Sequence, residues 1–87
     1  MIRKEISLGT TSPVQRRDAA KLVQIASRFE SRLVIEHDSK VINAKSMLGL
    51  LSLGQIQAGK VYLVADGDDE KAAVDAIVSL VEKGFEE

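Results

Sequence analysis

Apolar and polar side chains alternate along the first residues of the chain, which predicts a strand over residues 2–8. One side of this strand carries Ile2, Lys4, Ile6 and Leu8, and we expect the strand to be half-buried. Three later runs rich in β-branched residues predict further strands at 33–36, 41–43 and 61–65. Asp38 and Ser39 are common turn residues, so we interpret the second and third strands as a β-hairpin.

Apolar residues recur at helical spacing in two stretches. The first runs from Arg16 to about Phe29, and its apolar stripe consists of Ala19, Leu22, Val23, Ala26 and Phe29. The second follows the turn 66–69 and ends at Gly84, with a stripe formed by Ala73, Val74, Ile77, Leu80 and Val81. The run 47–53 is too short for periodicity to decide between strand and helix. Ser46 as N-cap and Gly54 as the residue after the last turn favour a helix.

The predicted order is therefore β-α-β-β-α-β-α in one domain spanning residues 1–87. Few strands and helices with one apolar stripe each favour an α+β fold, in which a single four-stranded antiparallel sheet carries three helices on one face. The opposite face of such a sheet can meet water.

Composition narrows the possible functions. The 87 residues carry a formal net charge of −1 and only three aromatic side chains, so the core must be aliphatic and a nucleic-acid binder is not expected. There is no cysteine, which excludes disulfides and a cysteine nucleophile. The N-terminal residues lack the apolar region of a signal peptide, and every apolar run is too short to cross a membrane. We therefore expect a cytoplasmic protein that does not contact membranes.

Residues that support enzyme chemistry are nearly absent. His37 is the only histidine, and without cysteine it cannot build the usual zinc sites, so we expect a solvated residue of the hairpin. The acidic cluster Asp66, Asp68, Asp69 and Glu70 lacks the spacing of a calcium loop, and helix capping by Asp68 or Asp69 explains it more simply. We therefore expect no enzyme, no cofactor and no metal.

Ser46 is the sharpest candidate site. One reading is an ordinary N-cap serine, and the other is a phosphoacceptor. The two readings are compatible, because the start of a helix has free N–H groups and favours negative charge. Lys40 and Lys45 lie close to Ser46 in sequence and are candidates to screen a phosphate there.

The apolar run after Ser46 has too many large side chains for one face of a short helix. We expect Leu50 and Leu53 to point inward and to leave a partly exposed patch, which suggests a docking surface. That patch consists of Met47, Leu48 and Leu51. The alternative is a helix that is buried more deeply. Arg17, at the start of the first helix, is either a solvated cation or a partner for phosphate.

Together these features resemble the HPr family, the histidine-containing phosphocarriers of the bacterial phosphotransferase system. Residues 43–54 (NAKSMLGLLSLG) resemble the regulatory serine motif of that family, and residues 19–29 are similar to its first helix. The resemblance implies an open-faced β-sandwich. It also implies that a dedicated HPr kinase/phosphorylase modifies Ser46 with ATP. The modified protein would then act as corepressor of a LacI-type transcription regulator in carbon catabolite repression.

The chain departs from the family at its phosphocarrier motif, Gly-Ile/Leu-His-Ala-Arg-Pro-Ala. Residues 13–19 read PVQRRDA, so Gln15 stands where the family has its phosphohistidine, while Arg17 matches the family arginine. Glutamine has no basic ring nitrogen and cannot carry the phosphoryl group. Glutamine for histidine with the serine retained resembles the Crh subgroup, catabolite-repression HPr-like regulators. Pro13, Arg16 and Asp18 depart from both groups and bear on the choice of partner.

Two functions remain open from the sequence. The first is a regulatory module that depends on phosphorylation of Ser46. Its expected partner-binding residues are Arg17, Lys40, Lys45, Met47, Leu48 and Leu51. The second is a protein-binding module that docks through the same apolar patch without phosphorylation. In either case we expect a monomer or a weak homodimer.

Overall fold

The computed structural model describes residues 1–8, 16–54 and 59–85. The side chains of Leu8 and Leu53 and the exposure of Gly54 and Gly59 are not described. The expected positions of the Leu8 and Leu53 side chains, like the placement of Pro13 and Gln15, therefore lie outside the described residues.

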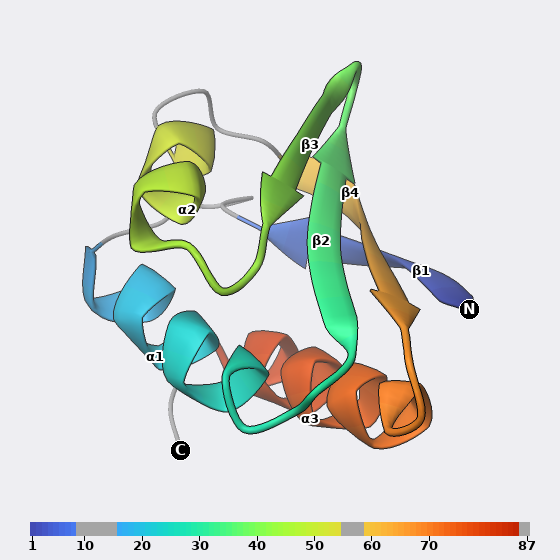
Figure 1. Cartoon of the computed structure of the whole chain (residues 1–87). Helices are drawn as coiled ribbons and strands as arrows, with labels where there is room; N and C mark the ends of the chain where they lie inside the picture. Colours follow the sequence, from blue (N-terminus) through green and yellow to red (C-terminus); the bar gives the residue numbers. More distant parts are fainter. Residues whose placement is uncertain (9–15, 55–58, 86–87) are drawn as a thin grey trace.

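Seven elements follow one another in the predicted β-α-β-β-α-β-α order (Figure 1). They are β1 (Ile2–Leu8), α1 (Arg16–Ala26), β2 (Arg32–His37), β3 (Lys40–Asn43), α2 (Met47–Gly54), β4 (Gly59–Asp66) and α3 (Glu70–Glu82). The short apolar run is a helix, as Ser46 and Gly54 indicated, although Gly54 is the last residue of α2 rather than the one after it.

The first helix ends at Ala26, earlier than the predicted end at Phe29. The backbone tightens there, because the N–H of Arg28 donates to the carbonyl of Ile25 at 3.1 Å and that of Phe29 to the carbonyl of Ala26 at 3.2 Å. These bonds span three residues instead of four, which is common where a helix ends. Phe29 therefore packs against the core from the connection after the helix.

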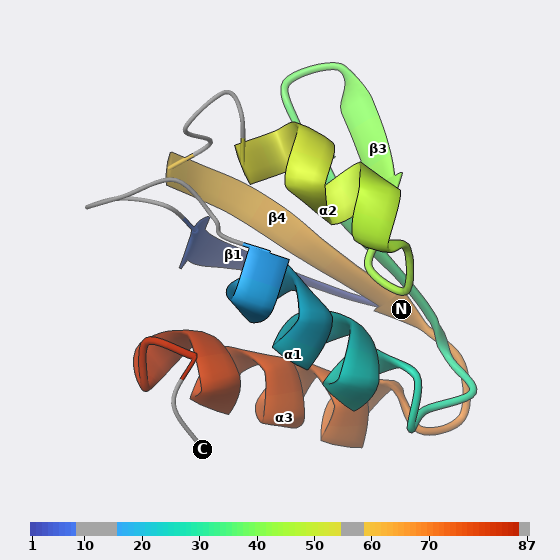
Figure 2. The same cartoon turned by 90° about the vertical axis from the view of Figure 1, so that its left-hand side faces the viewer.

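The four strands form one antiparallel sheet with the order β1-β4-β2-β3. The hairpin of β2 and β3 is confirmed, and β4 lies between β1 and β2, which places strands far apart in sequence next to each other. The three helices cover one face of this sheet, and α1 lies between α2 and α3 (Figure 2).

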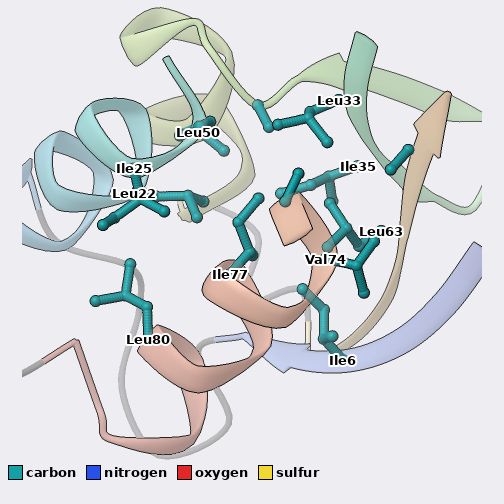
Figure 3. Close-up of a cluster of buried hydrophobic side chains, with 14 of the residues drawn as sticks. Ile6, Leu22, Ile25, Leu33, Ile35, Leu50, Leu63, Val74, Ile77 and Leu80 are labelled. Carbon is teal, nitrogen blue, oxygen red and sulfur yellow. The ribbon is translucent and has the colours of Figure 1, made fainter. Parts of the chain in front are cut away.

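The core lies between the sheet and the helices and is aliphatic, as the composition predicted (Figure 3). The largest fully buried side chains include Leu22 of α1, Leu63 of β4 and Ile77 of α3. Strand alternation places Leu33 and Ile35 of β2 on the same side, so both reach this core.

The opposite face of the sheet meets solvent, as expected. Tyr62 lies there, and the Arg3 guanidinium stacks 3.9 Å above its ring while Arg3 Nε is 3.1 Å from Glu36 Oε1. Val41, at 60% exposure, lies on this face as well. Over the described ranges, the structure contains no helix with the length and apolar character that a membrane span requires.

Candidate functional site

Ser46 caps the start of α2, which confirms the capping interpretation. Its Oγ accepts the N–H of Gly49 at 3.2 Å, and its carbonyl accepts the N–H of Leu50 at 3.1 Å. The side-chain bond satisfies one of the N–H groups that have no partner within a helix. The oxygen that would accept a phosphate therefore already lies at the positive end of α2.

The turn before α2 is fixed to the sheet by Asn43, the last residue of β3. The Asn43 side-chain oxygen accepts the N–H of Lys45 at 2.8 Å, and its carbonyl accepts the N–H of Ser46 at 3.0 Å. The N–H of the fully buried Ala44 donates to the carbonyl of Leu33 at 2.9 Å. A side chain that bonds the backbone two residues ahead is a common turn device. Ser46 is thus presented by a rigid turn.

Gly49 allows α2 to approach β3 closely. A Cβ at this position would lie 2.7 Å from Cγ2 of Ile42, a branched methyl that is itself packed in the core. Real side chains do not approach this closely without a shift. The absence of a side chain at Gly49 therefore sets how near the Ser46 end of α2 sits to the sheet.

We expect Gly49→Ala to destabilise the protein although alanine favours helices. The propensity gain of about 1 kcal/mol is opposed by an overpacking cost of about 1–3 kcal/mol. The net loss of unfolding free energy, about 1 kcal/mol, is measured by urea denaturation. Ser52→Ala is the matched control, because Ser52 is exposed in the same helix. Equal stability of the two variants would contradict the close approach.

The apolar side chains of α2 divide as predicted for those that the structure describes. Leu50 is buried, and Leu48 is 82% exposed. Met47 and Leu51 are half-buried and pack against the core from its edge. The patch therefore has one largely exposed side chain, Leu48, beside the partly buried side chains of Met47 and Leu51.

The lysines near Ser46 in sequence have different surroundings. Lys45 Nζ donates to the carbonyl of Phe29 at 2.8 Å, so the ammonium is held at the end of α1. Lys40 opens β3 at its hairpin end, opposite His37, whereas Asn43 ends the strand next to Ser46. Lys40 and Asn43 are the two ends of β3, so at a rise of about 3.3 Å per residue they are separated by about 10 Å. The expectation that Lys40 screens a charge on Ser46 therefore finds no support in this placement.

The basic residues of the first helix start lie on the surface. Arg16 and Arg17 are exposed in the first turn of α1, and Asp18, also in that turn, is half-buried and has an interaction of its own. Arg17 is available to a partner, whereas the Lys45 contact lies at the other end of α1.

The prediction that His37 is solvated is wrong. Its side chain is only 17% exposed, and within the described part of the chain Nδ1 is buried without a hydrogen-bond partner. Nε2 lies 3.9 Å from an oxygen of Asp38. His37 ends β2 on the same side of the strand as Ile35, and this side faces the helices.

The prediction that Asp68 or Asp69 caps the last helix is confirmed for the position of Asp69 but wrong for the side-chain bond. Asp69 occupies the N-cap position of α3, yet its carboxylate makes no capping bond. It instead accepts the N–H groups of Glu30 at 2.9 Å and Ser31 at 3.0 Å, and the hydroxyl of Ser31. The Ser31 hydroxyl and these N–H groups lower the pKa of Asp69, so the carboxylate stays ionised at neutral pH.

Asp69 and Ser31 are a pair that sequence reasoning missed. The two residues lie 38 positions apart and meet because β2 and α3 both start at the same end of the sheet. The sequence carries no local signal for this contact.

Over the described ranges, no cluster of three His, Cys, Asp or Glu side chains is arranged to hold a metal ion.

Comparisons with known proteins agree with this architecture. Residues 2–83 match the model of the phosphotransferase-system HPr component phosphorylation site. The HPr-like protein Crh of Halalkalibacterium halodurans is 39% identical over 83 residues, which cover 95% of this chain and 99% of the relative.

Two solved structures place both kinds of family member beside this chain. HPr-C-His from Thermoanaerobacter tengcongensis has a TM-score of 0.88 and 43% identity, over 100% of this chain and 99% of the other. Crh of Bacillus subtilis, described as a dimer with swapping, has a TM-score of 0.74 and 36% identity over 95% of each chain. The family model, the relatives and the fold agree, and this chain belongs to the HPr family.

Proposed function

We propose that this chain is a regulatory HPr-family protein of the Crh type, phosphorylated on Ser46 by an HPr kinase/phosphorylase. In this proposal the phosphorylated form acts in the cytoplasm as the corepressor partner of a LacI-type regulator in carbon catabolite repression. The observation that carries the proposal is the combination of Gln15 with a capping Ser46. Glutamine cannot carry the phosphoryl group of the family reaction, whereas the serine hydroxyl can accept one.

The geometry of Ser46 supports a modification that leaves α2 intact. A phosphate adds a charge of about −1.5 to −2 and three acceptor oxygens. Because Ser46 Oγ already accepts the N–H of Gly49, the added oxygens meet the same end of the helix. Negative charge stabilises that end of a helix. Phosphorylation therefore changes the charge beside the exposed Leu48 without requiring α2 to unfold.

The proposed partner surface combines this charge with the apolar patch and with three cations, of which Lys45 directly precedes Ser46. Leu48 supplies the most exposed apolar contact, and Met47 and Leu51 extend it. Exposed Arg17 is the candidate to orient an acidic group of the partner. Lys40 and Lys45 complete the proposed set of partner-binding residues.

The test is the affinity for a LacI-type regulator before and after phosphorylation of the whole protein, with the phosphate verified by intact mass. We expect binding to strengthen upon phosphorylation, because charge-assisted contacts add to the apolar ones. An affinity that does not change would refute the corepressor role. It would favour the second candidate, a module that binds its partner through the apolar patch without phosphorylation.

Leu48→Ala should weaken binding of the regulator about tenfold, as removal of a well-packed apolar anchor does. The free energy of unfolding should change by no more than about 0.5 kcal/mol, because Leu48 is 82% exposed. Titration calorimetry measures the first quantity and thermal unfolding the second. Val41→Ala is the matched control, since Val41 is also exposed but lies on the open face of the sheet. Both functions require the patch, so an unchanged affinity of Leu48→Ala argues against each.

We propose that the protein is a monomer or a weak homodimer. The Crh structure of Bacillus subtilis, described as a dimer, supports self-association within the family. Strand β1 lies at one edge of the sheet and carries exposed Lys4 and Glu5 at its centre. Charged residues on an edge strand oppose stable pairing with another strand.

A further inference from the structure

The connection between α1 and β2 is held from two sides. From one side, Lys45 Nζ, in the turn before α2, donates to the carbonyl of Phe29 at 2.8 Å. From the other side, the carboxylate of Asp69, at the start of α3, accepts the N–H groups of Glu30 and Ser31. Three consecutive residues, 29–31, therefore join the beginnings of α2 and α3.

The contact on the α2 side depends on a cation that directly precedes Ser46. The Lys45 ammonium binds a neutral carbonyl, which carries only a partial charge. The backbone of Lys45 is fixed by its hydrogen bond to Asn43, whereas the four-carbon side chain of Lys45 can rotate. A phosphate dianion on the next residue attracts an ammonium more strongly than a carbonyl does.

We propose that phosphorylation of Ser46 draws the Lys45 ammonium from the carbonyl of Phe29 to the phosphate and thereby loosens residues 29–31. This inference rests on the proposed function, because it requires a phosphate on Ser46. Phe29 loses its bond to the turn before α2, and Glu30 and Ser31 keep their bonds to Asp69.

Phosphorylation therefore alters a second surface besides α2. This surface consists of the exposed side chains Arg28, Glu30 and Arg32, which flank the buried Ser31. The loosened segment carries the effect of the phosphate from the start of α2 towards the start of α3. A partner that contacts this segment distinguishes the two forms without touching the phosphate.

The chain offers an internal control. Lys21 Nζ donates to the carbonyl of Phe85 at 2.6 Å, which is the same kind of bond between a lysine and a backbone carbonyl. This bond ties α1 to the end of α3 and involves neither Ser46 nor residues 29–31. Lys21→Met therefore removes an equivalent lysine–carbonyl bond away from Ser46 and residues 29–31.

The experiment measures amide hydrogen exchange of Glu30 and Ser31 by NMR in full-length protein. Phosphoserine is incorporated at position 46 during translation, so no kinase is needed. We expect phosphoserine to speed exchange of both amides up to about tenfold, the effect of losing one charge-assisted bond. Lys45→Met should speed exchange similarly without the phosphate, and the phosphate should add little in that variant. Lys21→Met should leave both amides unchanged.

The inference would be overturned if the exchange rates of the Glu30 and Ser31 amides were the same with serine and with phosphoserine at position 46. An equal response to phosphoserine in wild type and in Lys45→Met would overturn the role of Lys45. A kinase that leaves the wild-type chain unmodified is a different failure and counts against the proposed function. If the kinase acts but exchange does not change, the proposed function stands and only this inference fails.

Discussion

Ser46→Ala is expected to abolish phosphate incorporation when the protein is incubated with an HPr kinase/phosphorylase and ATP. The substitution removes the only oxygen that the proposal assigns as acceptor, so the effect is complete rather than partial. Intact mass before and after incubation measures the phosphate directly. Wild type should gain one phosphate and Ser46→Ala none.

Two controls separate loss of the acceptor from damage to the helix. Removing the cap costs about 1 kcal/mol, which leaves a folded protein that circular dichroism can verify. Ser52→Ala should still accept one phosphate, because this variant keeps Ser46. It is a matched control, because Ser52 is an exposed serine of the same helix. Phosphate on the Ser46→Ala variant would mean that another residue is the acceptor. Phosphoenolpyruvate with the general phosphotransferase enzyme should leave wild type unmodified if, as we propose, Gln15 occupies the position of the phosphohistidine.

Gly67→Ala should destabilise the fold strongly, although Gly67 lies on the surface. A Cβ at this position would sit 2.7 Å from the Cα of Ser31 and 2.9 Å from its Cβ. Backbone atoms cannot rotate away, so the β4–α3 turn has to move from the start of β2. That movement separates Asp69 from the hydroxyl and N–H of Ser31.

The expected loss is about 2 kcal/mol or more, the range of overpacking at a site that cannot relax. For a domain of this size, this loss lowers the melting temperature by about 10 °C or more. Thermal unfolding followed by circular dichroism measures the change. Asp68→Ala is the matched control, because Asp68 is exposed in the same turn and Asp69, not Asp68, occupies the N-cap position of α3. A melting temperature of Gly67→Ala equal to that of the control would contradict the close contact with Ser31.

The sequence by itself determined the features that rest on neighbouring residues. Alternation over 2–8 and the apolar stripes predicted the elements in their correct order, because each element carries its own periodicity. Ser46 was recognisable as a cap because its bond partner, Gly49, lies only three residues away. Family membership also followed from local motifs, and the predicted loss of the phosphohistidine at Gln15 rests on the sequence alone.

Only the tertiary structure decided the contacts between residues far apart in the chain. The sheet order puts β4 between β1 and β2, which no local pattern encodes. Asp69 looked like a helix cap, and His37 looked solvated, because burial and distant partners are invisible in sequence. The same holds for Lys45, whose bond to Phe29 spans 16 positions. Such contacts arise when the sheet and helices pack together. They place the bond between Lys45 and Phe29 beside Ser46, whose own capping bond is encoded locally.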